Sequence, residues 1–260
     1  MIDLTRFARE TLQREPYAWA AINNLFSRRD GAALAESFPC DHFKIVKGYD
    51  GEKDYEYEAR ALIPMGAYDV SHSDELSSAW LALAHDLLSP DYRVAMSLLT
   101  ERDLTSAPME VNVFHYGPRA RLGPHADLRD KLVTHVLYFN QSWEGVEGGC
   151  LNILRSADPT DVAAEILPVV GNSAVLVRSE NSWHSVPGVG SNCRTSRRSL
   201  ALTFYSPGSV STMWPSGDRT PLHRYDAPDL DPSARWRRRF GDRLSHAILR
   251  FKKATLWRRL

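Results

Sequence analysis

The sequence predicts an α+β fold that is mainly β: a β-sandwich or jelly roll with an N-terminal helical support and a C-terminal basic helix. Apolar residues recur at helical spacing through most of the first hundred residues, and short segments of period two follow from residue 109. With 260 residues, of which 43% are hydrophobic and 25% charged, the chain is long enough to bury a full core. We expect a support over 1–108, a β core over 109–207 and an extension over 208–260.

The N-terminal support is predicted to be helical with one β-hairpin. Apolar side chains follow helical spacing in two stretches of the first 26 residues, which are separated by Pro16. Acidic residues or a Ser-Pro pair mark the starts of two later helices. The expected elements are helices over 4–12, 19–26, 74–88 and 91–100, and a strand pair over 43–46 and 55–63 joined by a loop near Tyr49.

The β core is predicted from short segments in which apolar and polar residues alternate between turn residues. A further β segment is expected to start at His184, after the turn-prone Ser179–Ser182 stretch. More than six short strands after a helical lead favour a β-sandwich or jelly roll. The other candidate strands cover 109–116, 131–140, 149–155, 164–170, 173–178 and 197–205.

Charge is unevenly distributed, although the net charge is formally zero. Residues 234–260 carry ten Lys or Arg and one Asp, so the rest of the chain is acidic overall. Apolar residues between Trp236 and Phe251 follow helical spacing, which predicts a basic amphipathic helix. Such a helix can contact an anionic membrane surface, a glycan or a lipid carrier, or it can dock on the acidic body. No specific nucleic-acid partner is predicted.

Cysteine usage and hydropathy indicate the compartment. Cys40, Cys150 and Cys193 are widely spaced and form no C-x-x-C pair, so the sequence suggests neither a disulfide framework nor a zinc knuckle. The N-terminal residues lack the apolar region of a secretion signal, and no stretch has the apolar length of a membrane span. We expect a cytoplasmic protein, with a membrane-peripheral location as the alternative that the basic helix offers.

The triplet His125-Ala126-Asp127, followed after a long gap by His184, is the strongest chemical signal in the chain. His125 and Asp127 are two residues apart, so their side chains point the same way if the backbone is extended. Two imidazoles and one carboxylate can occupy one face of an octahedral Fe(II) and leave three positions for other ligands. Taken alone, a His-x-Asp triplet also fits a surface pair, so the assignment depends on its context.

Strand parity separates the residues that face a pocket from those that do not. In the segment 131–140, Tyr138 and His135 fall on opposite faces. In the segment 197–205, Arg197 shares a face with Ser199 and other small residues, whereas Arg198 shares a face with bulky apolar residues. We therefore expect Arg197 to be the anion anchor, with Arg198 as the fallback. Asn112 and Tyr116 share parity and can line the same pocket, although buried tyrosines are often simply core residues.

Several ordered motifs between residues 109 and 207 resemble the Fe(II)/2-oxoglutarate-dependent dioxygenases, in particular their prolyl-hydroxylase-like branch. The family pattern of Y-x-x-G/P, H-x-D, Y-L-N, G-G-x-L, H-x-V and R-x-S recurs here in the same order. The matching stretches are FHYGPRARLGPHAD, THVLYFNQSW, EGGCLNIL, GNSAVLVRSENSWHSV and RRSLALTFY.

This resemblance implies a double-stranded β-helix (jelly-roll) core and assigns roles to individual residues. The iron ligands fall on His125, Asp127 and His184. The 2-oxoglutarate partners fall on Arg197, Ser199, Tyr138 and Tyr116, with Asn112 as an additional candidate. The implied cofactor is Fe(II), with 2-oxoglutarate and O2 as co-substrates.

The resemblance implies hydroxylation of an unactivated C–H bond, with succinate and CO2 as co-products. The expected substrate is a small metabolite, an amino-acid-derived compound or a peptidyl proline. Candidate substrate contacts are Tyr49, Tyr55 and Tyr57 in the hairpin, Arg129 just after the His-x-Asp triplet and Trp183 beside His184. A solvated hairpin, exposed charges and simple packing are the alternatives for these residues.

Other functions remain open at the level of sequence. The same iron site can carry out desaturation, cyclisation or demethylation, because the position of the substrate decides between these outcomes. A non-catalytic binding protein on a jelly-roll scaffold is a hypothesis from a different class. A zinc hydrolase is a third, but it gives Arg197 no clear role.

Overall fold

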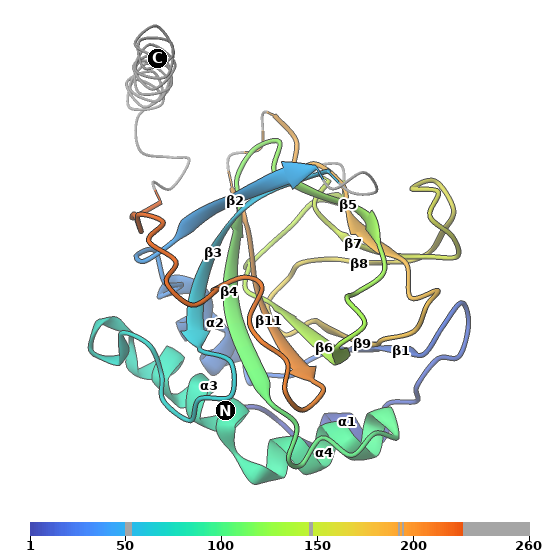
Figure 1. Cartoon of the computed structure of the whole chain (residues 1–260), viewed down its shortest axis with the longest axis horizontal. Coiled ribbons are helices and arrows are strands. Elements are labelled where there is room, and N and C mark those ends of the chain that lie inside the picture. The colour runs from blue at the N-terminus through green and yellow to red at the C-terminus, as the bar shows by residue number, and fades with distance from the viewer. Residues whose placement is uncertain (50–53, 146–147, 192, 194, 226–260) are drawn as a thin grey trace, which may run out of the picture. The chain divides into compact units, whose positions relative to one another are not determined.

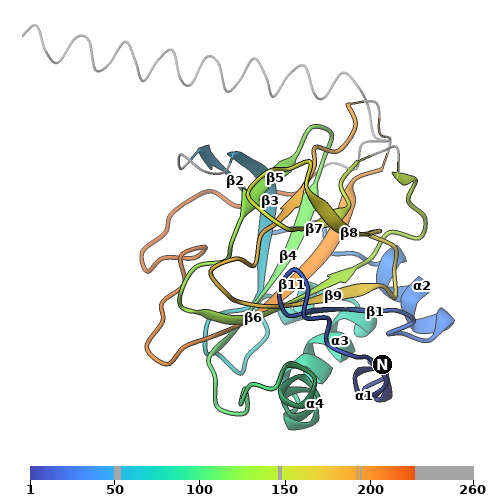
Figure 2. The ribbon, with the colours of Figure 1, turned by 90° about the vertical axis from the view of Figure 1, so that its right-hand side faces the viewer.

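The strands of this protein form one strongly curved antiparallel sheet. The computed structural model describes residues 1–49, 54–145, 148–191, 193 and 195–225, and residues 1–225 form one unit. The strands are β1 (Trp19–Ile22), β2 (Lys44–Tyr49), β3 (Asp54–Ile63), β4 (Met109–Tyr116), β5 (Arg121–His125), β6 (Lys131–Tyr138), β7 (Leu151–Leu154), β8 (Val162–Ile166), β9 (Ser173–Val177), β10 (His184–Val186) and β11 (Arg197–Tyr205). Their order is β1-β9-β6-β11-β4-β3-β5-β10-β7-β8, with β2 paired to β3. The sheet curls round on itself (Figures 1 and 2), which confirms the predicted jelly roll.

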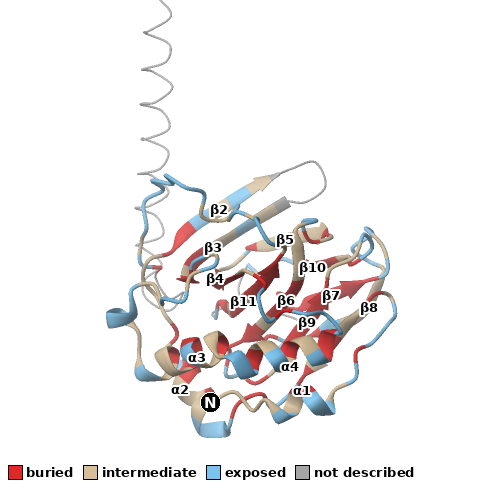
Figure 3. Ribbon diagram, turned by 60° about the horizontal axis from the view of Figure 1, so that its bottom comes forward, coloured by how far each residue is buried: buried red, intermediate tan, exposed pale blue. Residues whose placement is uncertain are grey.

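Helices cover one outer face of the sheet. They are α1 (Thr5–Arg9), α2 (Arg28–Glu36), α3 (Ser78–Leu88) and α4 (Pro90–Thr100), with a short 3₁₀ helix, η1 (Ser73–Glu75). The buried side of α3 and α4 packs toward the strands, while their exposed side faces away (Figure 3). Among the described residues, none of the helices combines the length and the apolar character needed to cross a membrane. The predicted basic helix lies outside the described residues.

Two hydrophobic clusters lie on opposite faces of the central strands because side chains alternate along each strand. Val111 of β4 and Leu200 of β11 pack against the helices in the larger cluster. Tyr116 of β4 and Tyr138 of β6 belong to the second cluster, inside the curved sheet. Each central strand therefore has one face in the helix-packed core and one face toward the interior of the jelly roll.

One expectation for the N-terminal support is wrong, and one helix was not predicted. The stretch predicted as a helix over 19–26 instead contains β1, which pairs with β9 at the edge of the sheet. A short apolar run fits both helical and strand periods, and only the partner strand decides between them. The following helix, α2, was not expected; it begins after Ser27, whose hydroxyl accepts a hydrogen bond from the backbone of Asp30.

Residues 206–225, the C-terminal strap, follow β11 and return to the sheet at the residue before β2. The backbones of Phe43 and His223 exchange hydrogen bonds in both directions. The ring of Tyr225 stacks on that of His115, with the ring centroids 3.7 Å apart. The carboxylate of Glu58 in β3 accepts a hydrogen bond from His115 at 2.5 Å and another from His223 at 2.6 Å. Glu58 thus joins the strap to the sheet.

We expect the Glu58 carboxylate to make folding sensitive to acid. Burial alone would raise the pKa of Glu58, but the hydrogen bonds from His115 and His223 lower it from 4.5 to about 2. A carboxyl group with a lowered pKa stabilises the fold fully above pH 4.5, and this stability is lost as the pH falls toward 2. The contribution is on the order of 3 kcal/mol. Burial also lowers the pKa of His115 in the folded protein. Below about pH 6.5 the unfolded chain therefore takes up a proton on this ring more readily than the folded protein does, which lowers the free energy of unfolding further.

Urea unfolding of the wild type and Glu58→Gln between pH 7 and pH 3 tests this expectation. The variant should be less stable at pH 7, and its free energy of unfolding should fall less steeply with acid than that of the wild type. Glu56→Gln is the matched control, because Glu56 is an exposed glutamate on the same strand. Equal slopes for the wild type and Glu58→Gln would contradict the assignment.

Candidate functional site

The fold brings His125, Asp127 and His184 together inside the curved sheet. His125 ends β5 and His184 begins β10, and the two residues face each other across the antiparallel pair. Their ring centroids are 4.3 Å apart. Asp127 lies two residues beyond His125, and one donor atom from each of the three side chains lies within 4.8 Å of the other two. The three residues that the sequence singled out as metal ligands therefore form one cluster.

Backbone carbonyl groups set the orientation of both imidazole rings. Nδ1 of His125 lies 2.9 Å from the carbonyl oxygen of Gly123, and Nδ1 of His184 lies 3.0 Å from that of Ser182. A carbonyl oxygen only accepts, so Nδ1 carries the hydrogen in each neutral ring. The lone pair is then on Nε2, the atom that can bind a metal. This is the arrangement by which proteins commonly orient metal-binding histidines.

The carboxylate of Asp127 is held by two side chains of β6. Lys131 donates to Oδ1 at 2.6 Å and Thr134 donates to Oδ2 at 2.9 Å. Burial opposes ionisation, but Lys131 together with His184 and His125 keeps the pKa of this carboxyl far below its usual range. Asp127 is therefore an ionised carboxylate at neutral pH, held in a fixed position.

The three residues open onto a cavity of about 150 Å³ between the two halves of the sheet. Inward-facing residues of β4, β6 and β11 form one wall, and β5, β7 and β10 contribute to the other. The lining includes His125, Asp127, His184, Arg197, Ser199, Tyr116, Asn112, Tyr57, Glu110, Lys131, Thr134, Thr203, Tyr205, Thr212 and Met213. The His125–Asp127–His184 cluster and the predicted anion anchor thus share one cavity.

At one end of the cavity, Arg197 lies buried among aromatic rings. Its guanidinium carbon is 4.8 Å from the centre of the Tyr116 ring and 5.2 Å from that of Tyr138. Nη1 donates to the hydroxyl of Ser199 at 2.8 Å, whereas Nε of Arg197 and the hydroxyl of Tyr138 are buried without a hydrogen-bond partner. Burial raises the pKa of both phenols, of Tyr116 to about 12, so both remain protonated donors.

Arg198 points away from this cavity. Its guanidinium donates to the carbonyl oxygen of Ala35 and lies over the ring of Phe38, both on the helix side of the sheet. The structure therefore gives the two adjacent arginines separate surroundings, in agreement with the strand parity expected from the sequence.

The C-terminal strap borders the opposite end of the cavity, where Thr212 and Met213 belong to the lining. Asn112 accepts a hydrogen bond from the indole of Trp214 at 2.7 Å and donates to Glu110 at 3.2 Å. Glu110 also accepts from the hydroxyls of Tyr205 and Ser211. Asn112, a candidate 2-oxoglutarate partner in the sequence, thus has hydrogen bonds to Trp214 and Glu110 at this end of the cavity.

Glu110 was not singled out from the sequence. Its position in the sequence could have indicated its place, because Glu110 is an even number of residues from Asn112 and Tyr116 and so lies on the same face of β4. In the structure it is only 2% exposed. Thr134 is a second residue that the sequence did not single out. It lies on the same face of β6 as Tyr138, and its hydroxyl donates to the carboxylate of Asp127.

The residues proposed to contact substrate are placed differently from one another. Tyr57 lines the cavity, and its ring stacks on that of Tyr116 with centroids 5.3 Å apart. Tyr55 is half-buried beside Tyr57, Arg129 is exposed and Trp183 is half-buried, and none of these three is among the residues that line the cavity. The side chain of Tyr49 lies outside the described residues.

The residues at this site fit Fe(II) and 2-oxoglutarate. Two imidazoles and a carboxylate are the donor set that ferrous oxygenases use, and they leave positions open for other ligands. The buried Nε of Arg197 and hydroxyl of Tyr138 offer unused hydrogen-bond donors for a carboxylate, the group that a guanidinium binds most strongly. The donor set and the anion anchor therefore suit both groups.

Comparison with known proteins agrees with this chemistry. Residues 111–205 match the model of the 2OG-Fe(II) oxygenase superfamily. No curated protein matches the chain. The solved structures that share the fold include two prolyl hydroxylases. A prolyl-4-hydroxylase of Pseudomonas putida is 20% identical, with a TM-score of 0.50, over 78% of this chain and 97% of the other. A prolyl 4-hydroxylase of Phytophthora capsici is 15% identical, with a TM-score of 0.52, over 80% of this chain and 66% of the other.

Proposed function

We propose that this protein, which belongs to the 2OG-Fe(II) oxygenase superfamily through residues 111–205, hydroxylates an unactivated C–H bond of a small substrate. It is an oxidoreductase, and the family implies Fe(II), 2-oxoglutarate and O2 as its cofactor and co-substrates. The observation that carries the proposal is the shared cavity, which holds the His125–Asp127–His184 cluster and the buried guanidinium of Arg197. Together, these residues can bind the metal and the far carboxylate of a keto acid.

Each residue has a separate task in this proposal. Nε2 of His125, Nε2 of His184 and the carboxylate of Asp127 hold the metal, while the hydrogen bonds to Gly123 and Ser182 keep the rings in place. When bound, Fe(II) with 2-oxoglutarate and O2 supplies the oxidising power to replace C–H by C–OH, as 2-oxoglutarate becomes succinate and CO2.

The other cavity residues orient the two substrates. Arg197 binds the distal carboxylate of 2-oxoglutarate through two N–H donors, assisted by the hydroxyls of Tyr138 and Ser199. The Tyr116 and Tyr57 rings exclude water from the guanidinium and strengthen this charge pair. The strap contributes Thr212 and Met213 to the lining at the other end, where we place the organic substrate.

Glu110 favours a substrate that carries an amino group. It is a buried carboxylate in the cavity lining, and its hydrogen-bond partners among the described residues are neutral groups. A buried carboxylate is stabilised by a cation. Among the expected substrates, an amino-acid-derived compound supplies one.

The proposal is tested by 2-oxoglutarate turnover. The protein, loaded with Fe(II) under anaerobic conditions, should release succinate after addition of 2-oxoglutarate and O2, and omission of any one of the three should stop it. A metabolite pool enriched in amines is then searched for a product that gains one oxygen atom from labelled O2. A product that loses two hydrogens instead would assign desaturation or cyclisation. If a folded, iron-loaded protein releases no succinate, the proposed oxygenase activity is contradicted.

A further inference from the structure

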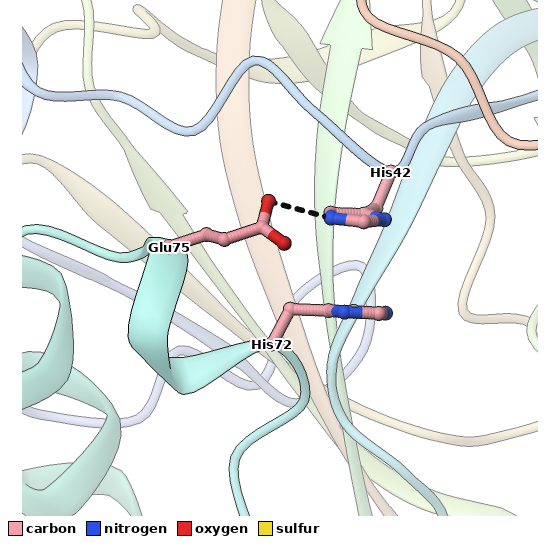
Figure 4. A group of neighbouring side chains, drawn as sticks. All are labelled: His42, His72 and Glu75. Carbon is pink, nitrogen blue, oxygen red and sulfur yellow. Dashed lines mark hydrogen bonds and ion pairs between the residues drawn. The ribbon is translucent and has the colours of Figure 1, made fainter.

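A second group of metal-binding side chains lies outside the cavity. His42 precedes β2, His72 precedes η1 and Glu75 ends η1, and the three side chains gather between these segments (Figure 4). One donor atom from each lies within 4.8 Å of the other two. None of the three lines the cavity that holds His125 and Asp127. The two clusters are therefore separate.

The contacts within this cluster are close and polar. Nε2 of His42 lies 2.7 Å from Oε2 of Glu75. The rings of His42 and His72 are stacked, with centroids 3.7 Å apart and planes 7° apart. A nitrogen lone pair lies in the plane of its ring, so one ring has to turn out of this stack for both rings to bind the same ion. The donor atoms of the two rings and of Glu75 are close enough together for this to bring all three onto one ion.

Hydrophobic burial does not account for this arrangement. His72 and Glu75 are exposed, and His42 is half-buried. Both histidines have a left-handed backbone, with φ of 63° for His42 and 51° for His72. This conformation costs about 1–2 kcal/mol for a residue other than glycine. Such residues concentrate at ligand-binding sites, where a ligand offsets the cost.

The surrounding charges favour a cation. Glu75 lines a neighbouring cavity of about 320 Å³ together with Glu36 and Asp41. Arg60 lines the same cavity and is 2% exposed, and Arg224 lies 3.6 Å from the carboxylate of Asp41, so two positive charges face three carboxylates. The negative charge that remains favours a bound cation.

We propose that His42, His72 and Glu75 bind a divalent transition-metal ion of the Zn(II) class. Two imidazole nitrogens and one carboxylate oxygen supply three ligands of a tetrahedral site, and water completes it. The ion joins the segment before β2 to the turn at η1. Since β2 pairs with β3, which carries Tyr57, the metal stabilises the part of the sheet that contributes this cavity residue. The ion raises the stability of this region and takes no part in the chemistry of the iron site.

Calorimetric titration with Zn(II) tests the proposal. The metal-free wild type should bind two equivalents, since Zn(II) also enters the iron site. The Asp127→Ala/His184→Ala variant, which lacks two iron-site ligands, should retain one equivalent and unfold at a higher temperature with Zn(II). Adding His72→Ala to this variant should abolish both the remaining Zn(II) equivalent and the rise in unfolding temperature with Zn(II). Adding His85→Ala instead is the matched control, because His85 is an exposed histidine on α3.

Glu75→Gln separates ligation from folding. The amide oxygen still accepts the hydrogen bond from His42, so the metal-free thermal midpoint should stay close to that of the parent. Loss of the charge should weaken Zn(II) binding at least tenfold. The proposal is overturned if the iron-site variant binds no Zn(II), or if His72→Ala leaves the second equivalent unchanged.

Discussion

Replacement of Asp127 by Ala should lower 2-oxoglutarate-dependent succinate release by at least about a thousandfold, which corresponds to roughly 4 kcal/mol of lost transition-state stabilisation. The reason is that Asp127 supplies the one carboxylate of the donor set. The variant also leaves the ammonium of Lys131 without the carboxylate that it contacts at 2.6 Å. Two histidines alone hold a divalent metal weakly, so iron content should fall together with activity.

Succinate release and bound iron, measured on the same preparation, check this prediction. Asp130→Ala is the matched control, because Asp130 is a neighbouring aspartate that does not line the cavity. It should retain iron and activity. Circular dichroism and thermal unfolding show that each variant is folded. Normal succinate release by a folded Asp127→Ala protein would show that Asp127 is not a metal ligand.

Arg197→Gln should raise the KM for 2-oxoglutarate about a hundredfold, with a much smaller effect on kcat at saturating co-substrate. A charge-assisted hydrogen bond in a buried site contributes about 3 kcal/mol, which corresponds to this factor. The effect should depend on the distal carboxylate. Wild-type protein should therefore prefer 2-oxoglutarate to 2-oxobutyrate, which lacks that group, and Arg197→Gln should lose most of the preference.

Arg198→Gln is the internal control for this measurement. Arg198 is the next residue on the same strand, but its guanidinium contacts Ala35 and Phe38 on the helix side. We expect it to affect stability and to leave the KM for 2-oxoglutarate within a few-fold of the wild type. A larger rise in KM for Arg198→Gln than for Arg197→Gln would show that the anchor was assigned to the wrong arginine.

The central strands were predictable because local pattern and tertiary contacts agree there. The predicted bounds 109–116 and 197–205 coincide with β4 and β11, which pair from Arg197 opposite Tyr116 to Phe204 opposite Met109. Alternation then places Arg197 and Arg198 on opposite faces. β1 was not predictable in the same way, because its apolar run becomes a strand only by pairing with β9.

The order of the motifs predicts that His125, Asp127 and His184 come together, but it does not predict the strand register or the neighbouring contacts that hold them. The register that places His125 opposite His184 depends on how two distant strands meet, which no local pattern encodes. Lys131 shows a second limit. By strict alternation it would share a face with His135, yet it lines the cavity, because the β6–β11 register shifts between Phe204 and Tyr205. Irregularities of this kind are set by tertiary packing.

The two-faced character of β6 has a consequence for how this enzyme can change over evolutionary time. Thr134 holds the carboxylate of Asp127, while the adjacent His135 is hydrogen-bonded to Tyr92 of α4 at 2.7 Å in the layer behind. A mutation in that layer that displaces His135 also displaces Thr134, since one backbone carries both. Adaptation to a new substrate should therefore show epistasis with residues of α4 that never touch it.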